Sequence, residues 1–182
     1  MEIAVGADNG RMVRFDETEV RIMGRSSTGV KAIEFDETDN VVGAEVITPE
    51  KQILVVTENG YGKKTSVEEY RKTHRGSKGV KALNTTEKTG KMVSLRCVEG
   101  NEDLIIITDA GITVRLTLEQ VSSLGRNTQG VRLIKLKDDQ KVSTVTTVIK
   151  AEEDENTENS SSETVEEITE TVENSVKEEV NE

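Results

Sequence analysis

The sequence predicts an all-β fold of about three propeller-like blades, each with four antiparallel strands. A 24-residue pattern occurs three times, at 10–33, 60–83 and 111–134, and its first glycines lie 50 and 51 residues apart. Short apolar segments precede and follow each copy, so one repeat offers about four strand-sized segments. A period near fifty residues in an all-β chain is typical of propeller blades. We expect the repeats near residues 3–47, 53–98 and 104–149.

The first strand of each repeat is the apolar run before the pattern. In the second and third repeats it spans residues 53–56 and 104–107, and a continuous apolar run between turn residues is typical of a strand buried on both faces. Asn59-Gly60 after the second run indicates a hairpin, because both residues tolerate positive φ. The first repeat has only Glu2–Val5 here. We interpret the chain as the C-terminal part of a longer one rather than as one with an incomplete first blade.

The second strand alternates apolar and basic residues in two of the repeats. Val13 and Phe15 flank Arg14, and a valine and a leucine flank Arg115. Alternation with a period of two places the apolar pair on the packed face and the arginine on the other. The middle repeat has Lys63 and Thr65 at the apolar positions. We therefore expect its strand to be more exposed, or shifted in register by one residue.

The rest of each repeat predicts a turn, a loop and two more strands. An acidic segment at 16–19, 66–69 and 117–120 indicates a turn or a single helical turn, and a glycine-rich loop follows it. A third strand is expected at 30–33, 80–83 and 131–134. A fourth strand is expected at 41–47, 92–98 and 142–149.

The charge of the chain divides into two parts. The formal net charge is −11, yet residues 151–182 hold 13 of the 35 acidic residues and only one of the 24 Lys and Arg residues. That segment therefore has a net charge of −12, and residues 1–150 have +1. We predict a partial propeller domain over 1–150 and a disordered acidic tail over 151–182.

Basic residues recur at fixed places in the pattern and form the candidate binding site. Counted from the first glycine, positions +4, +15 and +21 are basic in every copy. We expect them on one rim, with the +15 arginines equivalent, because phosphate contacts by such cations supply affinity without reading sequence. The alternative is that they are solvated charges neutralised by the acidic segments. The full set of candidates is Arg14, Arg25, Lys31, Lys63, Lys64, Arg71, Arg75, Lys78, Lys81, Arg115, Arg126 and Arg132.

Composition and motifs argue against several other functions. Two Tyr, two Phe and no Trp disfavour single-strand binding by base stacking. His74 has no Cys or His nearby for a metal site, and we find no catalytic constellation, cofactor motif or small-molecule substrate site. The single Cys97 fits a reducing compartment, and no run approaches the roughly 18 apolar residues of a membrane span. We expect a cytoplasmic, nucleoid-associated protein that does not contact a membrane.

The repeated pattern resembles a known family. Copies that read G-x3-[RK], then R-x3-G-V, with a lead-in such as Val56–Thr65, are similar to the C-terminal domain of bacterial DNA gyrase A and its topoisomerase IV counterpart. The resemblance implies a β-pinwheel, a propeller variant that exchanges strands between blades and wraps duplex DNA on a basic outer rim. It also implies partners: duplex DNA, the remaining domains of gyrase A, and gyrase B.

Two departures from the family limit what the resemblance implies. The gyrase box Gln-Arg-Arg-Gly-Gly-Lys-Gly has only a partial counterpart at 73–79, which keeps Arg75, Gly76, Lys78 and Gly79. The DNA-cleaving tyrosine domain has no counterpart, so the chain alone is not expected to cut DNA. The leading expectation is sequence-independent DNA wrapping in support of negative supercoiling. The rival is a propeller scaffold that binds protein, since one fold can serve many functions.

Overall fold

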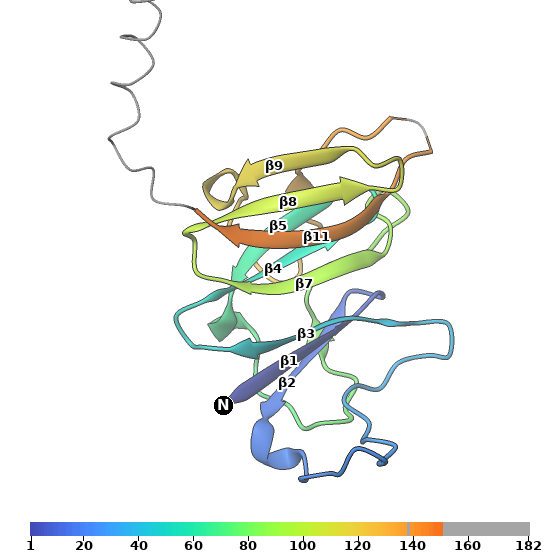
Figure 1. The fold of residues 1–182 in the computed structure, drawn as a ribbon, viewed down its shortest axis with the longest axis vertical. Helices are drawn as coiled ribbons and strands as arrows, with labels where there is room; N and C mark the ends of the chain where they lie inside the picture. The colour runs from blue at the N-terminus through green and yellow to red at the C-terminus, as the bar shows by residue number, and fades with distance from the viewer. Residues whose placement is uncertain (138, 151–182) are drawn as a thin grey trace, which may run out of the picture. The chain divides into compact units, whose positions relative to one another are not determined.

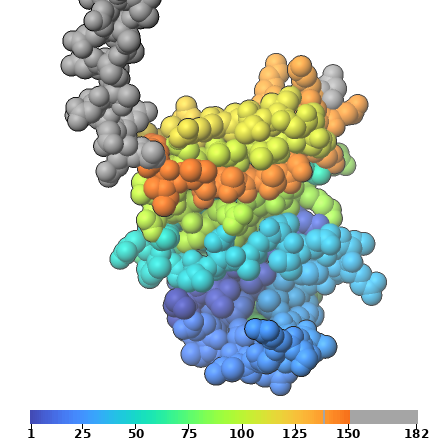
Figure 2. Space-filling view, in the orientation of Figure 1, coloured from blue at the N-terminus to red at the C-terminus, as the bar shows by residue number. Residues whose placement is uncertain are grey.

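A computed structural model describes residues 1–137 and 139–150, and these residues form three antiparallel β-sheets (Figure 1). The expected acidic tail at 151–182 lies outside the described residues. The colours in Figure 2 show the three repeats succeeding one another along the described domain, from blue through green to orange. The fold is all-β, as the sequence predicts.

The first two strands of every repeat form a hairpin. These pairs are β1 (Glu2–Ala7) with β2 (Arg11–Asp16), β4 (Gln52–Thr57) with β5 (Tyr61–Ser66), and β8 (Glu102–Thr108) with β9 (Thr113–Thr117). The register repeats as well, because Arg14 lies opposite Ala4, Lys64 opposite Leu54 and Arg115 opposite Ile105. The predicted hairpins and their basic strands are confirmed.

The predicted fourth strand closes each sheet beside its first strand. It is β3 (Val41–Ile47), β7 (Met92–Val98) and β11 (Val142–Ile149), paired with β1, β4 and β8 respectively. β3 contacts β7, and β7 contacts β11. The three closing strands therefore line one side of the described domain, one above another in Figure 1.

The fourth strand in each of the first two sheets comes from the following repeat. β6 (Val80–Lys81) pairs with β2, and β10 (Val131–Arg132) pairs with β5. The sheet orders are β3-β1-β2-β6, β7-β4-β5-β10 and β11-β8-β9. Strands are thus exchanged between neighbouring blades, and the third sheet has three strands among the described residues.

The expected strand at 30–33 is absent from the described structure. Its counterparts pair with the preceding repeat, and residues 30–33 have no preceding repeat to pair with here. They form one isolated bridge instead, from Ile33 to Ser77 of the second repeat. The third segment of a repeat becomes a strand only when a neighbouring blade supplies the other edge.

The acidic segments form single turns of 3₁₀-helix. These are η1 (Glu17–Glu19), η2 (Val67–Glu69) and η3 (Leu118–Gln120). Asp16 and Ser66 start two of them, because their side chains accept the backbone N–H of Thr18 and Glu68 and satisfy donors at the helix start. Val67 and Leu118 are fully buried. Each fixes its helical turn against apolar residues of the preceding blade.

The middle strand β5 corrects the expectation of exposure or a shifted register. Its register matches that of β2, and Lys63 and Thr65 are both fully buried. The Lys63 Nζ donates to the Gly125 carbonyl at 2.6 Å, and the Thr65 hydroxyl donates to the Leu124 carbonyl at 2.6 Å. Polar side chains can fill this face because main-chain carbonyls of the next repeat accept their hydrogen bonds.

Candidate nucleic-acid interface

The order of strands within a sheet defines two edges with different surroundings. β7 closes the second sheet at the edge that faces the other closing strands, whereas β10 lies at the opposite edge. β6 holds the same outer position in the first sheet. The basic residue at +21 belongs to these outer strands in the second and third copies, so the fold places it away from the closing strands.

Position +21 is the one place in the pattern where all three copies expose a cation. Lys31, Lys81 and Arg132 are exposed. Val80, the residue before Lys81, is buried, because successive side chains of a strand point to opposite faces. Of the expected rim positions, +21 fits the prediction best.

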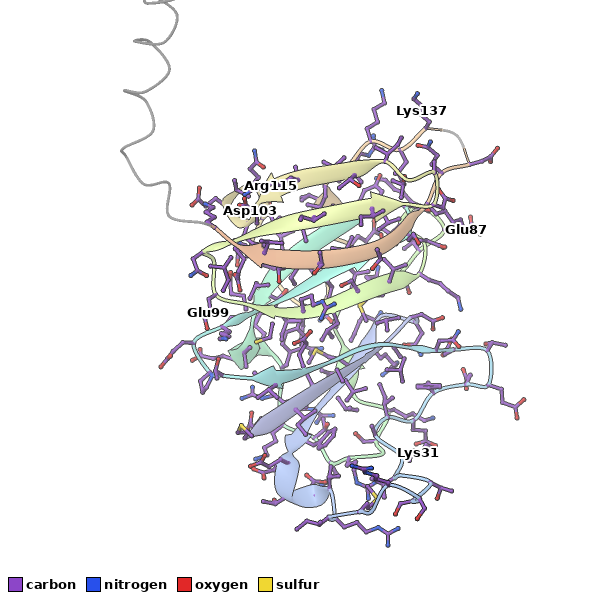
Figure 3. All side chains as sticks on the ribbon, in the orientation of Figure 1. Lys31, Glu87, Glu99, Asp103, Arg115 and Lys137 are labelled. Carbon is purple, nitrogen blue, oxygen red and sulfur yellow. The ribbon has the colours of Figure 1, made fainter. Side chains whose placement is uncertain are left out.

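Position +4 has a structural role in the first two repeats. The Arg14 Nη1 donates to the Val67 and Tyr70 carbonyls at 2.8 and 3.0 Å, and its Nε donates to Glu2 at 2.5 Å. The Lys64 Nζ donates to the Leu118 carbonyl at 2.8 Å. Both cations therefore hold the helical turn of the next repeat. Arg115 has no following repeat here: it pairs with Asp103 while its side chain is 66% exposed (Figure 3).

Position +15 is not equivalent in the three repeats, contrary to expectation. The Arg75 guanidinium donates to the carbonyls of Glu19 and Lys31 at 3.2 and 2.6 Å, so it anchors the second repeat to the first. Arg126 is half-buried, and its backbone N–H donates to Glu69. Arg25 is exposed. Only Arg25 fully presents its side chain to solvent, because only its loop lacks a preceding blade among the described residues.

Lys63 does not fit the expected role of a rim cation. Its side chain is fully buried, and burial lowers its pKa to about 8. Its ammonium group is directed to the main chain of the glycine-rich loop that holds Arg126. We therefore remove Lys63 from the set of residues that could contact a phosphate.

Basic residues of the loop that follows η2 line one hollow. It has a volume of about 360 Å³, and its lining residues are Arg71, Lys72, Thr73, His74, Ser77, Lys78 and Gly79. Among the described residues that line it, none is acidic. Lys72 is not in the predicted set. Its ammonium lies 3.0 Å from Asp16 and 3.3 Å from Glu2.

A second hollow lies where the second and third repeats meet. It measures about 340 Å³ and is lined by Asn59, Tyr61, Lys88, Arg132, Ile134, Lys135, Leu136 and Gln140. The cations of Lys88 and Arg132 each lie 5.5 Å from the Tyr61 ring centroid, a cation–π geometry. Lys88 and Lys135 fall outside the repeated pattern, so a comparison of shared positions does not find them.

Hydrogen bonds beside the loop lower the pKa of two nearby carboxyl groups. A backbone N–H of Arg75 donates to Glu19 and lowers the pKa of that carboxyl, with a smaller contribution from His74. Hydrogen bonds from Thr18 and Lys72 hold the pKa of Asp16 well below its usual range. Negative charge thus remains close to part of this basic surface, as the alternative of neutralised surface charges anticipates.

The described residues can be compared with the geometry of a metal site and of a membrane-spanning helix. They contain no group of three His, Cys, Asp or Glu side chains placed to hold a metal ion. No helix in the same part of the chain is long and apolar enough to cross a membrane.

The comparisons with known proteins agree on one fold class. Solved structures that resemble the chain include the C-terminal domain of DNA topoisomerase IV, with a TM-score of 0.77 and 23% identity over 81% of this chain and 46% of that one. They also include a DNA gyrase A C-terminal domain, with a TM-score of 0.75 and 23% identity over 81% of this chain and 50% of that one. At these identities the likeness shows the fold, which is a β-pinwheel of the propeller class.

The sequence comparisons give the family. The family described as "DNA gyrase C-terminal domain, beta-propeller" matches residues 2–48, 51–99 and 102–149. The chain is also 48% identical over 149 residues to the DNA gyrase A protein of Staphylococcus aureus strain MRSA252, and the match covers 81% of this chain and 17% of that protein. The chain belongs to the DNA gyrase A C-terminal domain family, and it spans less than a fifth of the protein that it matches.

Proposed function

We propose that this chain binds and wraps duplex DNA without regard to sequence, as the C-terminal part of a gyrase A protein. The observation that most directly supports this is the exposed cation at +21 in every repeat, which in the second and third copies lies on the outer strands β6 and β10. A duplex presents phosphates at regular intervals, so cations repeated from blade to blade suit its backbone. Membership of the gyrase family supplies the biological setting.

The chain would act by bending DNA, with the chemistry supplied by other parts of the enzyme. The remaining domains of gyrase A, together with gyrase B, would cut, pass and reseal the duplex. The wrapped segment would bias that cycle towards negative supercoils. Such a protein would act in the cytoplasm, on the nucleoid, and would need no cofactor of its own.

The first test is the affinity of the full chain for short duplexes at several salt concentrations. Each neutralised phosphate contributes about −0.9 to the slope of log K against log salt, so two or three phosphates per blade predict roughly −5 to −8. Unrelated duplex sequences should bind alike. A slope near zero, or a strong preference for one sequence, would contradict the proposal.

A matched pair of variants locates the interface. Lys31→Ala, Lys81→Ala and Arg132→Ala combined should make the slope shallower by about 3, at roughly 0.9 per lost phosphate contact. Arg96→Ala serves as the control, because Arg96 is an exposed cation on β7, at the edge opposite β10. Equal effects of the triple change and the control would mean that the outer strands are not the interface.

Wrapping is measured separately from binding, because a bound duplex can be bent without being wound around the protein. A nicked DNA circle sealed by ligase while the chain is bound should show a shifted linking number. The triple variant should reduce that shift. Tight binding without any shift would support DNA binding but reject wrapping.

A further inference from the structure

The hollow between the second and third repeats has the composition of a phosphate site. Lys88, Arg132 and Lys135 line it, and among its described lining residues none is acidic. Lys88 belongs to the second repeat, and the other two cations belong to the third, on or just after β10. Two blades thus supply cations to one volume of about 340 Å³. Cations placed together without carboxylates repel one another, so an anion between them is favoured.

Tyr61 holds two of these cations in place. Its side chain is buried, and its hydroxyl accepts a hydrogen bond from the Arg132 Nη2 at 3.0 Å. The cations of Lys88 and Arg132 each lie 5.5 Å from the ring centroid. Because the ring already contacts two cations, it is not free to stack on a base. The hollow therefore suits a phosphate, whose recognition carries no sequence information.

An apolar wall completes the hollow. Ile134 and Leu136 line it, and both are half-buried. Sugar and phosphate alternate along a nucleic-acid backbone, so a deoxyribose beside a bound phosphate could pack against this wall. A small inorganic anion would leave the wall in contact with water. The lining thus favours a phosphate that belongs to a nucleic-acid backbone.

The corresponding loop between the first and second repeats is acidic. The Asn9 amide donates to the Asp39 carboxylate at 2.6 Å, whereas the Asn59 amide donates to the Lys88 carbonyl at 3.1 Å. Residues 34–40, which include Asp39, contain four acidic residues and neither Lys nor Arg. A phosphate close to this loop would be repelled. The two junctions therefore differ in charge, although they belong to the same repeat pattern.

The +21 cations of the two junctions also have different partners. Arg132 lies opposite Tyr61, which holds its guanidinium beside the hollow. Lys81 lies opposite Arg11, a like charge, and its ammonium donates to the Asn84 side-chain oxygen at 3.1 Å. An arginine can also bind a phosphate through two parallel hydrogen bonds, whereas a lysine acts as a point charge. Arg132 is thus better prepared for a phosphate than Lys81.

We propose that the hollow between the second and third repeats seats a backbone phosphate of the duplex, with Tyr61 as the positioning residue for Arg132. Lys88 and Lys135, which lie outside the repeated pattern, contact the same stretch of backbone. This site presupposes the DNA binding proposed above and makes its contacts unequal. The second and third repeats together hold the duplex more tightly than the first and second do.

The first experiment compares Arg132→Ala with Lys81→Ala, because both residues occupy +21. Affinity of the full chain for a short duplex should fall about tenfold for Arg132→Ala, the effect of losing a hydrogen bond from a charged donor. Lys81→Ala should cause a clearly smaller fall. Equal falls overturn the site and leave the proposed DNA binding intact. A wild-type chain that does not bind the duplex rejects the proposed function, and the site with it.

Lys135→Ala and Lys137→Ala form a second matched pair within one loop. Lys135 lines the hollow, whereas Lys137 is exposed and is not among the lining residues. Figure 3 shows Lys137 on the same side of the described domain as Glu87, the neighbour of Lys88. Lys135→Ala and Lys88→Ala should each make the slope of log K against log salt shallower by about 0.9, and Lys137→Ala should leave it unchanged. Equal slopes for Lys135→Ala and Lys137→Ala overturn the site.

A double-mutant cycle tests the positioning role of Tyr61. Tyr61→Phe keeps the ring and removes the hydroxyl, so duplex binding should weaken about two- to tenfold. The same change should have no effect in the Arg132→Ala chain, because the hydroxyl acts through Arg132. Circular dichroism of each variant must match that of the wild type. A weakening of equal size in both backgrounds, or in neither, rejects the positioning role.

Inorganic phosphate distinguishes a duplex site from a site for a free anion. In calorimetry with the full chain, no saturable binding of inorganic phosphate is expected, because a small ion does not cover the apolar wall. Saturable binding that Arg132→Ala removes, with duplex affinity unchanged by the same variant, would assign the hollow to a free anion. That outcome would overturn the duplex site.

Discussion

Lys63 is a buried cation, and its environment has a measurable consequence. Its ordinary pKa of 10.5 falls to about 8 because the side chain is buried, while Glu69 acts to raise it and Arg126 to lower it. The Gly125 carbonyl accepts its hydrogen bond. Between these two pKa values the unfolded chain binds more protons than the folded chain at this position, so stability contributed by Lys63 rises with pH.

We therefore predict that Lys63→Met removes a rise in the free energy of unfolding between about pH 8 and 10.5. The measurement is urea denaturation of wild type and variant at several pH values. Lys137→Met, which replaces an exposed lysine, should leave the pH dependence unchanged. If wild type and Lys63→Met show the same pH dependence, the ammonium is not held in the buried position described.

Arg75 and Arg25 share a position in the pattern but should respond differently to substitution. Arg75→Ala removes hydrogen bonds to two carbonyls of the first repeat, and a bond to a charged donor contributes about 1.5–3 kcal/mol. Arg25→Ala changes an exposed loop residue and should alter stability by no more than about 0.5 kcal/mol. Thermal or urea unfolding of both variants tests this, and equal losses would contradict the anchoring role of Arg75.

At the scale of elements, the exchanged strands hold each blade to the next. Ala82 N and Leu83 N donate to the Gly10 carbonyl, and Leu133 N and Ile134 N donate to that of Gly60. The glycine before each exchanged strand permits this approach through its positive φ and its missing side chain. The stability of a repeat domain depends on such interfaces as well as on the single repeats.

Gly79→Ala should thus destabilise the domain by about 2 kcal/mol or more, since a left-handed backbone costs about 1–2 kcal/mol and overpacking adds to it. Gly100→Ala separates backbone strain from overpacking, because Gly100 has a positive φ but a Cβ there would have no close neighbour. Urea denaturation should show a larger loss for Gly79→Ala. Similar losses for the two variants would mean that β6 does not pack against β2 as closely as described.

At the scale of the whole molecule, charge is divided between the body and the segment 151–182. That segment has a net charge of −12 and is tethered to a body with exposed cations. A tether gives an effective concentration in the millimolar range, and the Debye length is about 10 Å at 0.1 M salt. Weak electrostatic competition with DNA is therefore expected in dilute buffer.

We predict that deletion of residues 152–182 tightens duplex binding at low salt and changes it less at high salt. Affinities of full-length, deleted and scrambled-tail chains at two salt concentrations provide the measurement. Scrambling at fixed charge should preserve the effect, because the mechanism depends on charge. Equal affinities of the full-length and deleted chains at low salt would rule out competition, and an effect lost on scrambling would indicate a specific sequence.

Local physical rules were enough to predict much of the fold from the sequence. The hairpins, the helical turns and the closing strands lie where apolar runs, Asn-Gly turns and acidic segments indicate them. The family resemblance carried by the repeated pattern is also confirmed. These features are set by residues close together in the chain, so a linear pattern describes them well.

The tertiary structure decided which cations are exposed, and that division is not visible in the sequence. Arg25 and Arg75 occupy the same place in the pattern, and so do Arg14 and Arg115, yet their surroundings differ. The physical reason is strand exchange. Whether a cation points to solvent or binds a main-chain carbonyl depends on the neighbouring blade, about fifty residues away, and each repeat meets a different neighbour.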